Sequence, residues 1–300
     1  MKQFLLNLFV SLLALQSYAQ QSLEWEMYHP VQQTWLPFGQ SGTVQEFLWH
    51  NGELPDPFYG ENETKYQWIE AHTWMFRSKF FLNEAYYNAE ELILDIPNLD
   101  TYAQIYLNGK LLAKTENFFV HYRFWLKRND LICGYNQLEI RIEAPINYHA
   151  KTERYTSFTY PAPNDVGAVK VASLTRKPQY HFGWDWGPRL VTSGIWKPIS
   201  LNAWNGFRIE DVFINYKIEN SKAFLTAKVE ASASSSMNET EVYAHIKVGD
   251  EVIKNQRIEL KEGSNNFELD FEIKNLEVIC NANSVEVINK YCFRCRPMNC

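Results

Sequence analysis

Short apolar runs alternate with turn residues along this chain from Trp74 onward. An alternation of period two is typical of half-buried β-strands, and these runs are enriched in β-branched and aromatic residues. Before residue 150 they read TWMFRSKFFL, AEELILDI, AQIYLNGKLLAKT, FVHYRFWL and NQLEIRIEAP. No helical period persists for long, so the pattern predicts an antiparallel β-sandwich or barrel.

Two stretches between the runs have the composition of turns. Asn108-Gly109, between IYL and KLL, predicts a two-residue hairpin, because both central residues accept positive φ. The stretch PDPFYGENE (55–63) contains two prolines and a glycine, which favour a rigid turn with a structural role over a direct ligand contact.

A second series of strands follows Asn205-Gly206, which indicates a domain boundary. Its runs read RIEDVFINYKI, AFLTAKVEASA, EVYAHIKV, QRIELKE and NNFELDFEI, and the polar stretch SASSSMNET separates the second from the third. Five or so strands in about 70 residues are typical of a small immunoglobulin-like sandwich that is nearly complete. We therefore expect one β-domain at residues 20–205 and a second, incomplete one at 206–276.

The first 19 residues have the pattern of a secretory signal peptide. Met1-Lys2 is positively charged, Phe4–Leu15 is mostly apolar, and Ser17-Tyr18-Ala19 resembles an A-x-A cleavage site. The apolar run is short for a membrane span, which takes about 20 residues. We expect cleavage near Ala19 and a soluble exported protein with no membrane partner, located in the periplasm or outside the cell, or in the lysosome of a eukaryote.

Residues 277–300 break the strand pattern and contain four of the five cysteines. The spacing C-x11-C-x2-C-x4-C allows a zinc knuckle, but it is irregular and no histidine assists. An aberrant C-terminus, such as the product of a frameshift, accounts for the segment better, and we expect no metal site. Cys133 stands alone and is expected to be a small buried apolar residue.

Composition narrows the possible ligands. The chain has 10 Trp, 17 Tyr and 19 Phe, more than an ordinary core needs, and this load suits packed sheets and the binding of flat, ring-shaped ligands. The net charge of −6, without any basic run, argues against nucleic acid as a partner.

The sequence FGWDWG (182–187) places Asp185 between Trp184 and Trp186. A pyranose has an apolar face of C–H groups, which an indole covers, and an equator of hydroxyls. A carboxylate accepts hydrogen bonds from two neighbouring hydroxyls, and these bonds offset the cost of desolvating it. The triplet therefore supplies both kinds of contact that recognise a hexose.

The geometry of a regular strand would separate these residues, because Asp185 would point away from both tryptophans. Gly183, Gly187 and Pro188 favour an irregular loop instead. We expect Asp185 and one indole at the sugar and the other indole packed beneath, with Trp186 as the packed one.

Structural interpretations of the same residues remain open. Asp185 could cap a turn or pair with Arg189, and Arg176 and Lys177 could neutralise it or merely border the loop. The histidines have no metal-like spacing with carboxylates, so structural or exposed roles are expected of them; those considered are His72, His121, His149 and His181.

Five stretches, in order, resemble the N-terminal part of the β-mannosidases of glycoside hydrolase family 2. They are SGTVQEFL (41–48), LPDPFYGENE (54–63), WIEAHTWMFR (68–77), AQIYLNGKLLAKTENFFVHYRF (103–124) and RKPQYHFGWDWGPRLVTSGIWKPISL (176–201). The resemblance extends from residue 28 to about residue 275. It implies an all-β chain: a jelly-roll, galactose-binding-like sandwich and then an immunoglobulin-like sandwich. In the family a (β/α)8 catalytic barrel follows, and the residues after 205 are too few for a barrel of about 250 residues.

The resemblance also implies an activity, namely removal of terminal non-reducing β-D-mannose from oligosaccharides with retention of configuration. The two catalytic glutamates of the family lie on the barrel and have no counterpart here, so we expect no catalytic residue, no cofactor and no activity from this chain alone. By position in the family motif, Asp185 is the first candidate for substrate binding, followed by Trp184 and Trp186. The expected partners are a β-mannoside oligosaccharide and the missing barrel. Two alternatives are a stand-alone carbohydrate-binding module and another family 2 specificity, such as β-galactosidase or β-glucuronidase.

Overall fold

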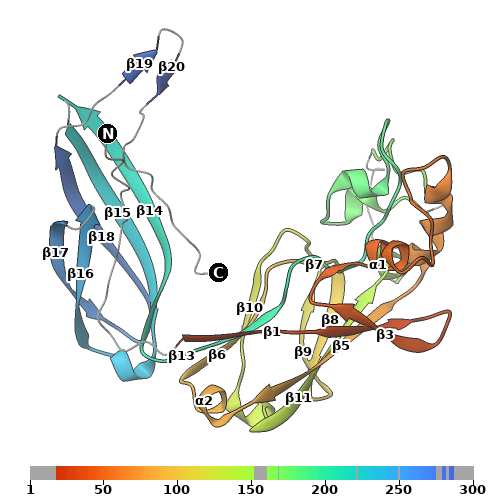
Figure 1. Ribbon diagram of the computed structural model, residues 1–300, viewed down its shortest axis with the longest axis horizontal. Helices are drawn as coiled ribbons and strands as arrows, with labels where there is room; N and C mark the ends of the chain where they lie inside the picture. Colours follow the sequence, from red (N-terminus) through yellow and green to blue (C-terminus); the bar gives the residue numbers. More distant parts are fainter. Residues whose placement is uncertain are drawn as a thin grey trace. The chain divides into compact units, whose positions relative to one another are not determined.

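The computed structural model describes residues 18–151, 161–167, 169–220, 222–248, 251–274, 279–281 and 284–286. These residues are mostly in strands and form two compact units, of which one comprises Ala19–Ala203 and the other begins at Trp204 (Figure 1). The all-β prediction is confirmed. The expected domain limits at 19, 205 and 276 stay predictions, and most of the expected signal peptide lies outside the described residues.

The first unit is a sandwich of two principal antiparallel sheets. The four-stranded sheet has the order β1 (Tyr18–Ser22), β13 (Ser200–Trp204), β6 (Glu91–Ile96) and β10 (Tyr122–Trp125). The six-stranded sheet has the order β3 (Thr34–Gly39), β2 (Trp25–His29), β5 (Trp74–Leu82), β11 (Gly134–Glu143), β8 (Tyr102–Leu107) and β9 (Lys110–Thr115). A third, short sheet has the order β4 (Gly42–Thr43), β12 (Gly194–Ile195) and β7 (Leu99–Asp100).

The alternation that predicted the strands also builds the core. On β5, Trp74, Phe76 and Phe80 point inward and are buried, while the residues between them are more exposed or polar. They belong to one hydrophobic cluster with Ile140 of β11 and Leu201 of β13, so the cluster includes residues of both principal sheets. Burial of this apolar area is the main stabilising contribution to the unit.

The hairpin at Asn108-Gly109 is confirmed. Leu107 pairs with Lys110 across the turn, and Asn108 and Gly109 have φ of 49° and 79°. Both central residues are left-handed, as the turns that match strand twist require. The Asn108 side chain also accepts a hydrogen bond from the main-chain N–H of Gln137 at 2.9 Å, which ties the turn to β11.

Helices are short and lie in the connections between strands. The α-helices are α1 (Val44–His50), α2 (Glu84–Tyr87) and α3 (Pro145–Ala150). The 3-10 helices are η1 (Asn62–Ala71), η2 (Arg128–Asp130), η3 (Ala172–Leu174), η4 (Gln179–Phe182) and η5 (Ser235–Met237). Among the described residues, no helix is long and apolar enough to cross a membrane.

The second unit contains all five strands that the sequence predicts. One sheet has the order β14 (Phe207–Glu219), β15 (Lys222–Ala233) and β18 (Gly263–Lys274), and the other pairs β16 (Thr240–Val248) with β17 (Glu251–Leu260). Their inner residues share a hydrophobic cluster that includes Leu225, Val229, Ile246 and Leu269. The β-sandwich prediction for this region is confirmed.

Two expectations about cysteine-bearing segments are corrected. Cys133 is exposed, not buried, because it lies in the connection between η2 and β11 and outside the alternating strand pattern. The C-terminal segment does contain a strand pair, β19 (Ile279–Asn281) with β20 (Ser284–Glu286), in which Cys280 pairs with Val285. The other three cysteines of the considered zinc knuckle lie outside the described residues.

Candidate functional site

Trp184, Asp185 and Trp186 lie on a tight turn at the exposed tip of a loop. The main-chain N–H of Gly187 donates to the carbonyl of Trp184 at 3.4 Å, and these two residues form an isolated antiparallel bridge. Asp185 and Trp186 are therefore the two central residues of the turn. The prediction of an irregular loop in place of a regular strand is confirmed.

All three side chains of the triplet are exposed. Trp184 is 43% exposed and Trp186 is 83% exposed, and the two indoles contact each other edge to face with ring centroids 5.8 Å apart. The expectation that Trp186 packs in the core is wrong, because Trp186 is a central residue of an exposed turn and its side chain projects into solvent. The turn presents one carboxylate and two indoles to the solvent.

Gly183 precedes the turn at a position where only glycine fits. Its φ is 117°, and a Cβ there would lie 2.5 Å from the main-chain oxygen of Asn164. An L-side chain would be strained by the backbone angle and would also clash with a peptide group that cannot rotate away. The chain thus enters the turn in close contact with the segment around Asn164.

Arg189 fixes the chain where it leaves the turn. Its guanidinium donates to both carboxylate oxygens of Glu70, at 2.6 and 2.9 Å, and to Oε1 of Gln67 at 2.5 Å. Asp165 lies 3.8 Å from the same guanidinium. Arg189 is 8% exposed, and it forms its ion pairs with Glu70 and Asp165, which argues against the alternative that Asp185 pairs with Arg189.

Glu70 and Gln67 belong to η1, which follows the predicted rigid turn. The Oδ1 of Asp56 accepts from the main-chain N–H of Phe58 at 2.9 Å, and the hydroxyl of Tyr66 donates to the carbonyl of Pro55 at 2.6 Å. These bonds order the segment that leads into η1. The stretch PDPFYGENE therefore has a structural role, as the sequence predicts.

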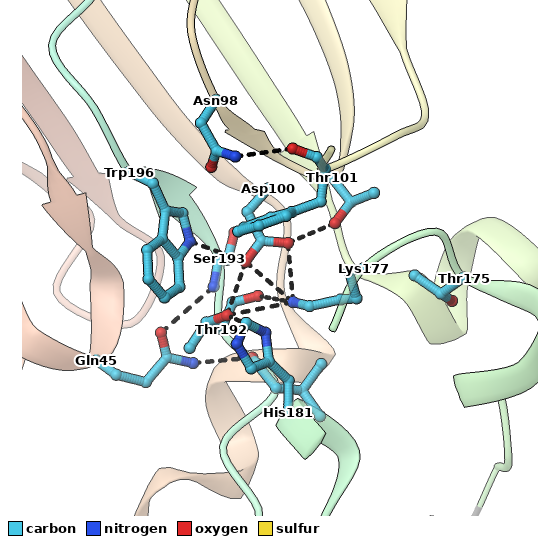
Figure 2. Close-up of polar contacts among 12 residues, drawn as sticks. Gln45, Asn98, Asp100, Thr101, Thr175, Lys177, His181, Thr192, Ser193 and Trp196 are labelled. Atoms are coloured by element: carbon cyan, nitrogen blue, oxygen red, sulfur yellow. Dashed lines mark hydrogen bonds and ion pairs between the residues drawn. The ribbon is translucent and has the colours of Figure 1, made fainter. Parts of the chain in front are cut away.

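A fully buried ion pair lies at the base of the same loop (Figure 2). The side chains of Lys177 and Asp100 are both 0% exposed, with Nζ 2.8 Å from Oδ1. Lys177 also donates to the main-chain carbonyl of Thr192 at 2.7 Å. Lys177 thus pairs with Asp100, and Arg176 pairs with Glu116 at 3.5 Å. Of the two alternatives left open for these residues, neutralisation of Asp185 therefore has no support.

The Asp100 carboxylate has a complete set of donors. Besides Lys177, it accepts from the hydroxyl of Thr101, from Oγ1 of Thr192 at 2.7 Å and from Nε1 of Trp196 at 3.1 Å. A carboxylate taken out of water is tolerated only when its lone pairs are satisfied in this way. The donors come from segments 77 to 96 residues away along the chain as well as from the adjacent residue.

His181, in η4, contacts two of the residues that donate to Asp100, namely Thr192 and Trp196. Its Nδ1 lies 2.9 Å from Oγ1 of Thr192, and its ring is stacked on Trp196 with centroids 5.6 Å apart and an interplanar angle of 6°. Burial is the main cause that lowers the pKa of His181, to about 4; the Lys177 charge lowers it further and Asp100 opposes the shift. Burial likewise lowers the pKa of Lys177, against the pull of Asp100. His181 is therefore neutral at pH 7.

The side chains on and beneath the turn decide which chemistry it could support. Among the residues that the structure describes, no group of three or more His, Cys, Asp or Glu side chains comes together to hold a metal ion. The exposed turn offers two indole surfaces and one acceptor group, and the buried groups beneath hold its two ends. An indole can stack on the apolar face of a ring, and a carboxylate can accept hydrogen bonds from hydroxyl groups.

Comparison with known proteins agrees with this fold. A family model described as the galactose-binding domain-like domain of glycosyl hydrolase 2 matches residues 25–197, more than half of the chain. The sandwich of the first unit is therefore a galactose-binding-like domain. The chain belongs to the glycosyl hydrolase 2 family.

Several curated proteins that are similar to this chain are β-mannosidases. A β-mannosidase from Capra hircus is 30% identical over 221 residues, which cover 68% of this chain and 25% of the relative. A β-mannosidase B from Thermothelomyces thermophilus is 33% identical over 201 residues, which cover 66% of this chain and 23% of the relative. The chain spans about a quarter of the length of these curated relatives.

Solved structures extend the likeness beyond the matched domain. The crystal structure of a β-D-mannosidase from Dictyoglomus thermophilum has a TM-score of 0.74 at 31% identity and covers 87% of this chain and 32% of its own. An exo-chitosanase from Amycolatopsis orientalis, at 17% identity and a TM-score of 0.60, covers 89% of this chain and 30% of its own, and shares the fold alone.

Proposed function

We propose that this chain is the N-terminal part of a retaining β-mannosidase that removes terminal non-reducing β-D-mannose from oligosaccharides. In this proposal Asp185, Trp184 and Trp186 bind the sugar. The observation that carries it is the turn itself: one carboxylate and two indoles project into solvent from a loop with buried polar anchors on both sides. The likeness to β-mannosidases over two thirds of the chain supports mannose as the sugar.

In the proposed mechanism, one part of the enzyme binds the sugar and another part cleaves the glycosidic bond. Asp185 would accept hydrogen bonds from two neighbouring hydroxyls, and the indole of Trp184 or Trp186 would cover the apolar face of the ring. Retaining hydrolysis needs two carboxyl groups about 5–5.5 Å apart, one as acid and base and one as nucleophile. In the proposal that pair belongs to a catalytic barrel outside this sequence, and the chain alone binds but does not hydrolyse.

Binding is tested by titrating the purified chain with methyl β-D-mannoside and following its indole NMR resonances. We expect millimolar affinity, because one turn contacts only part of the sugar. Asp185→Ala should weaken binding at least about tenfold, the loss expected when hydrogen bonds to a charged group are removed. Asp211→Ala, at an exposed aspartate of the second unit, is the matched control and should leave the affinity unchanged. Equal affinity of the wild-type chain and Asp185→Ala would contradict the assignment of Asp185.

Hydrolysis is tested separately with a chromogenic β-mannoside. The expected result is no turnover by the purified chain. Turnover that Asp185→Ala abolishes would refute the claim that the catalytic pair lies elsewhere. Binding without turnover is also what a stand-alone carbohydrate-binding module would give, and the exposure of all three side chains on this chain favours that second candidate. The two are separated by whether the coding sequence continues into a barrel.

We also propose that the protein is exported, on the strength of its N-terminal pattern. The mature protein would then begin near residue 20. N-terminal sequencing of the secreted or periplasmic product tests this, and an intact Met1 on that product would contradict it.

A further inference from the structure

The loop that carries the turn is closed at its base by a side chain. Lys177 stands at one end and Thr192 at the other, and Nζ of Lys177 donates to the main-chain oxygen of Thr192 at 2.7 Å and lies 3.3 Å from its Oγ1 (Figure 2). The loop of residues 178–191 therefore begins and ends at the same place in the fold. We call Lys177, Thr192 and Asp100 the neck of this loop.

The neck is attached to the sandwich by Asp100. This residue lies on β7, which pairs with β12 through Asp100 and Gly194, and its carboxylate binds Lys177 from one end of the loop and Thr192 from the other. A side chain from α1 holds the returning end as well, because Nε2 of Gln45 donates to the carbonyl of Val191 at 2.9 Å. Both ends of the loop are thus fixed to elements that are independent of the turn.

The two sides of the loop between neck and turn have separate anchors. On the outgoing side, His181 is held by Thr192 and stacked on Trp196. On the returning side, Arg189 is held by Glu70. Residues 182–188 lie between these two anchors, and residues 184–187 form the exposed turn within them, so the direction in which Asp185 points depends on how the neck and the two anchors hold the chain.

A buried ion pair is poor evidence for stability, since an apolar pair of similar volume is often as stabilising or more so. What the pair supplies is geometry: a lysine with three donors joins two chain ends and a carboxylate at fixed distances. A binding turn gains affinity when it is already ordered before the ligand arrives. The neck has the composition and the position for that role.

We propose that Lys177 is a positioning residue for sugar recognition, which, with Asp100 and Thr192, holds the loop so that Asp185 and its flanking indoles are presented in the binding orientation. The inference rests on the proposed function, since it assumes that the turn binds a sugar. It adds residues that touch no sugar and lie at the opposite end of the loop.

The experiment compares three variants of the full chain. Lys177→Met keeps the length of the side chain and removes its charge and donors. Lys177→Met with Asp100→Asn also removes the unpaired buried charge, and should therefore regain stability without restoring the link to Thr192. Leu201→Ala is the matched control: it leaves a cavity in the same unit, at a fully buried residue of β13, which lies outside residues 178–191 and outside the neck.

Three quantities are measured well below the unfolding temperature of every variant: the unfolding midpoint, the indole NMR resonances of Trp184 and Trp186, and the affinity for methyl β-D-mannoside. Both Lys177 variants should shift or broaden the two indole resonances and weaken binding about tenfold. The double variant should have a higher midpoint than Lys177→Met and no better affinity. Leu201→Ala should lower the midpoint and leave the resonances and the affinity as in the wild type.

The inference is overturned if the double variant binds as the wild type does with unchanged resonances, or if Leu201→Ala loses affinity to the same extent. If Lys177→Met does not fold, Thr192→Val serves instead, because it removes the Oγ1 contacts and keeps the main-chain contact; unchanged resonances of both indoles in that variant would overturn the inference. If the wild-type chain does not bind the mannoside, the proposed sugar contact fails, and the indole resonances alone decide whether Lys177 orders the turn.

Discussion

Acid should destabilise the first unit through His181. The pKa of this residue is lowered from 6.5 to about 4 in the folded protein, mainly because the ring is buried and further because Lys177 is close, while Asp100 acts in the opposite direction. The unfolded chain therefore binds a proton before the folded one does. Stability is complete above about pH 6.5, falls as the pH falls towards 4, and loses nothing further from this group below pH 4.

The magnitude follows from the difference in pKa. One pKa unit corresponds to about 1.4 kcal/mol, so lowering the value from 6.5 to about 4 makes a difference of about 3 kcal/mol between pH 7 and pH 4. That is a large part of the 5–15 kcal/mol by which a typical domain is stable. His181 would thus make a large contribution to the acid sensitivity of this unit.

The assay is urea unfolding at a series of pH values, followed by tryptophan fluorescence. Carboxylates also titrate in this range, so the wild type is compared with His181→Gln, which stays neutral and keeps a group able to hydrogen-bond Thr192. The free energy of unfolding of the wild type should fall by about 3 kcal/mol more than that of His181→Gln between pH 7 and pH 4. Parallel pH profiles for the two proteins would refute the reasoning.

Two further substitutions test the local geometry. Gly183→Ala should destabilise the first unit by about 2 kcal/mol or more, because the new Cβ would lie 2.5 Å from a main-chain oxygen at a φ of 117°. Urea unfolding measures this loss. Gly109→Ala is the control: its Cβ would have no atom within 4 Å, so it separates the effect of the clash from that of the backbone strain. Thr43→Ala should cost about 1 kcal/mol, because Thr43 caps α1 and forms a capping box with Glu46; an unfolding midpoint equal to that of the wild type would count against this role.

Local patterns predicted most of the strands because the information for them is local. Alternation placed the inward residues of β5, and Asn108-Gly109 specified its hairpin through backbone angles that few other residue pairs accept. Alternation did not reveal α1; the local signal for this helix, the capping box of Thr43 and Glu46, was missed. Two expectations for single residues were wrong, namely that Cys133 is buried and that Trp186 is packed. Both were based on residue type, but the exposure of these residues depends on their position in a connection and in a turn.

The buried neck could not be predicted in the same way. Lys177 and Asp100 are 77 residues apart, and nothing near either residue indicates the other. The sequence indicated Lys177 only as a candidate neighbour of Asp185. Lysine is usually exposed, and an ion pair with an acid close to it in the sequence is the simplest expectation. Which acid it reaches depends on how β7, β12 and the loop meet in the fold, and that is set by the packing of the whole sandwich.

The loop is joined at its base by noncovalent contacts whose members all lie outside the turn. The four residues at the tip can therefore be exchanged while the frame that carries them keeps its own bonds. With the proposed sugar-binding role of the turn, a library that varies Trp184, Asp185 and Trp186 and preserves Lys177 and Arg189 would sample new ligand preferences on an unchanged support. In this arrangement selection, natural or in the laboratory, can act on what the domain recognises without rebuilding how it folds.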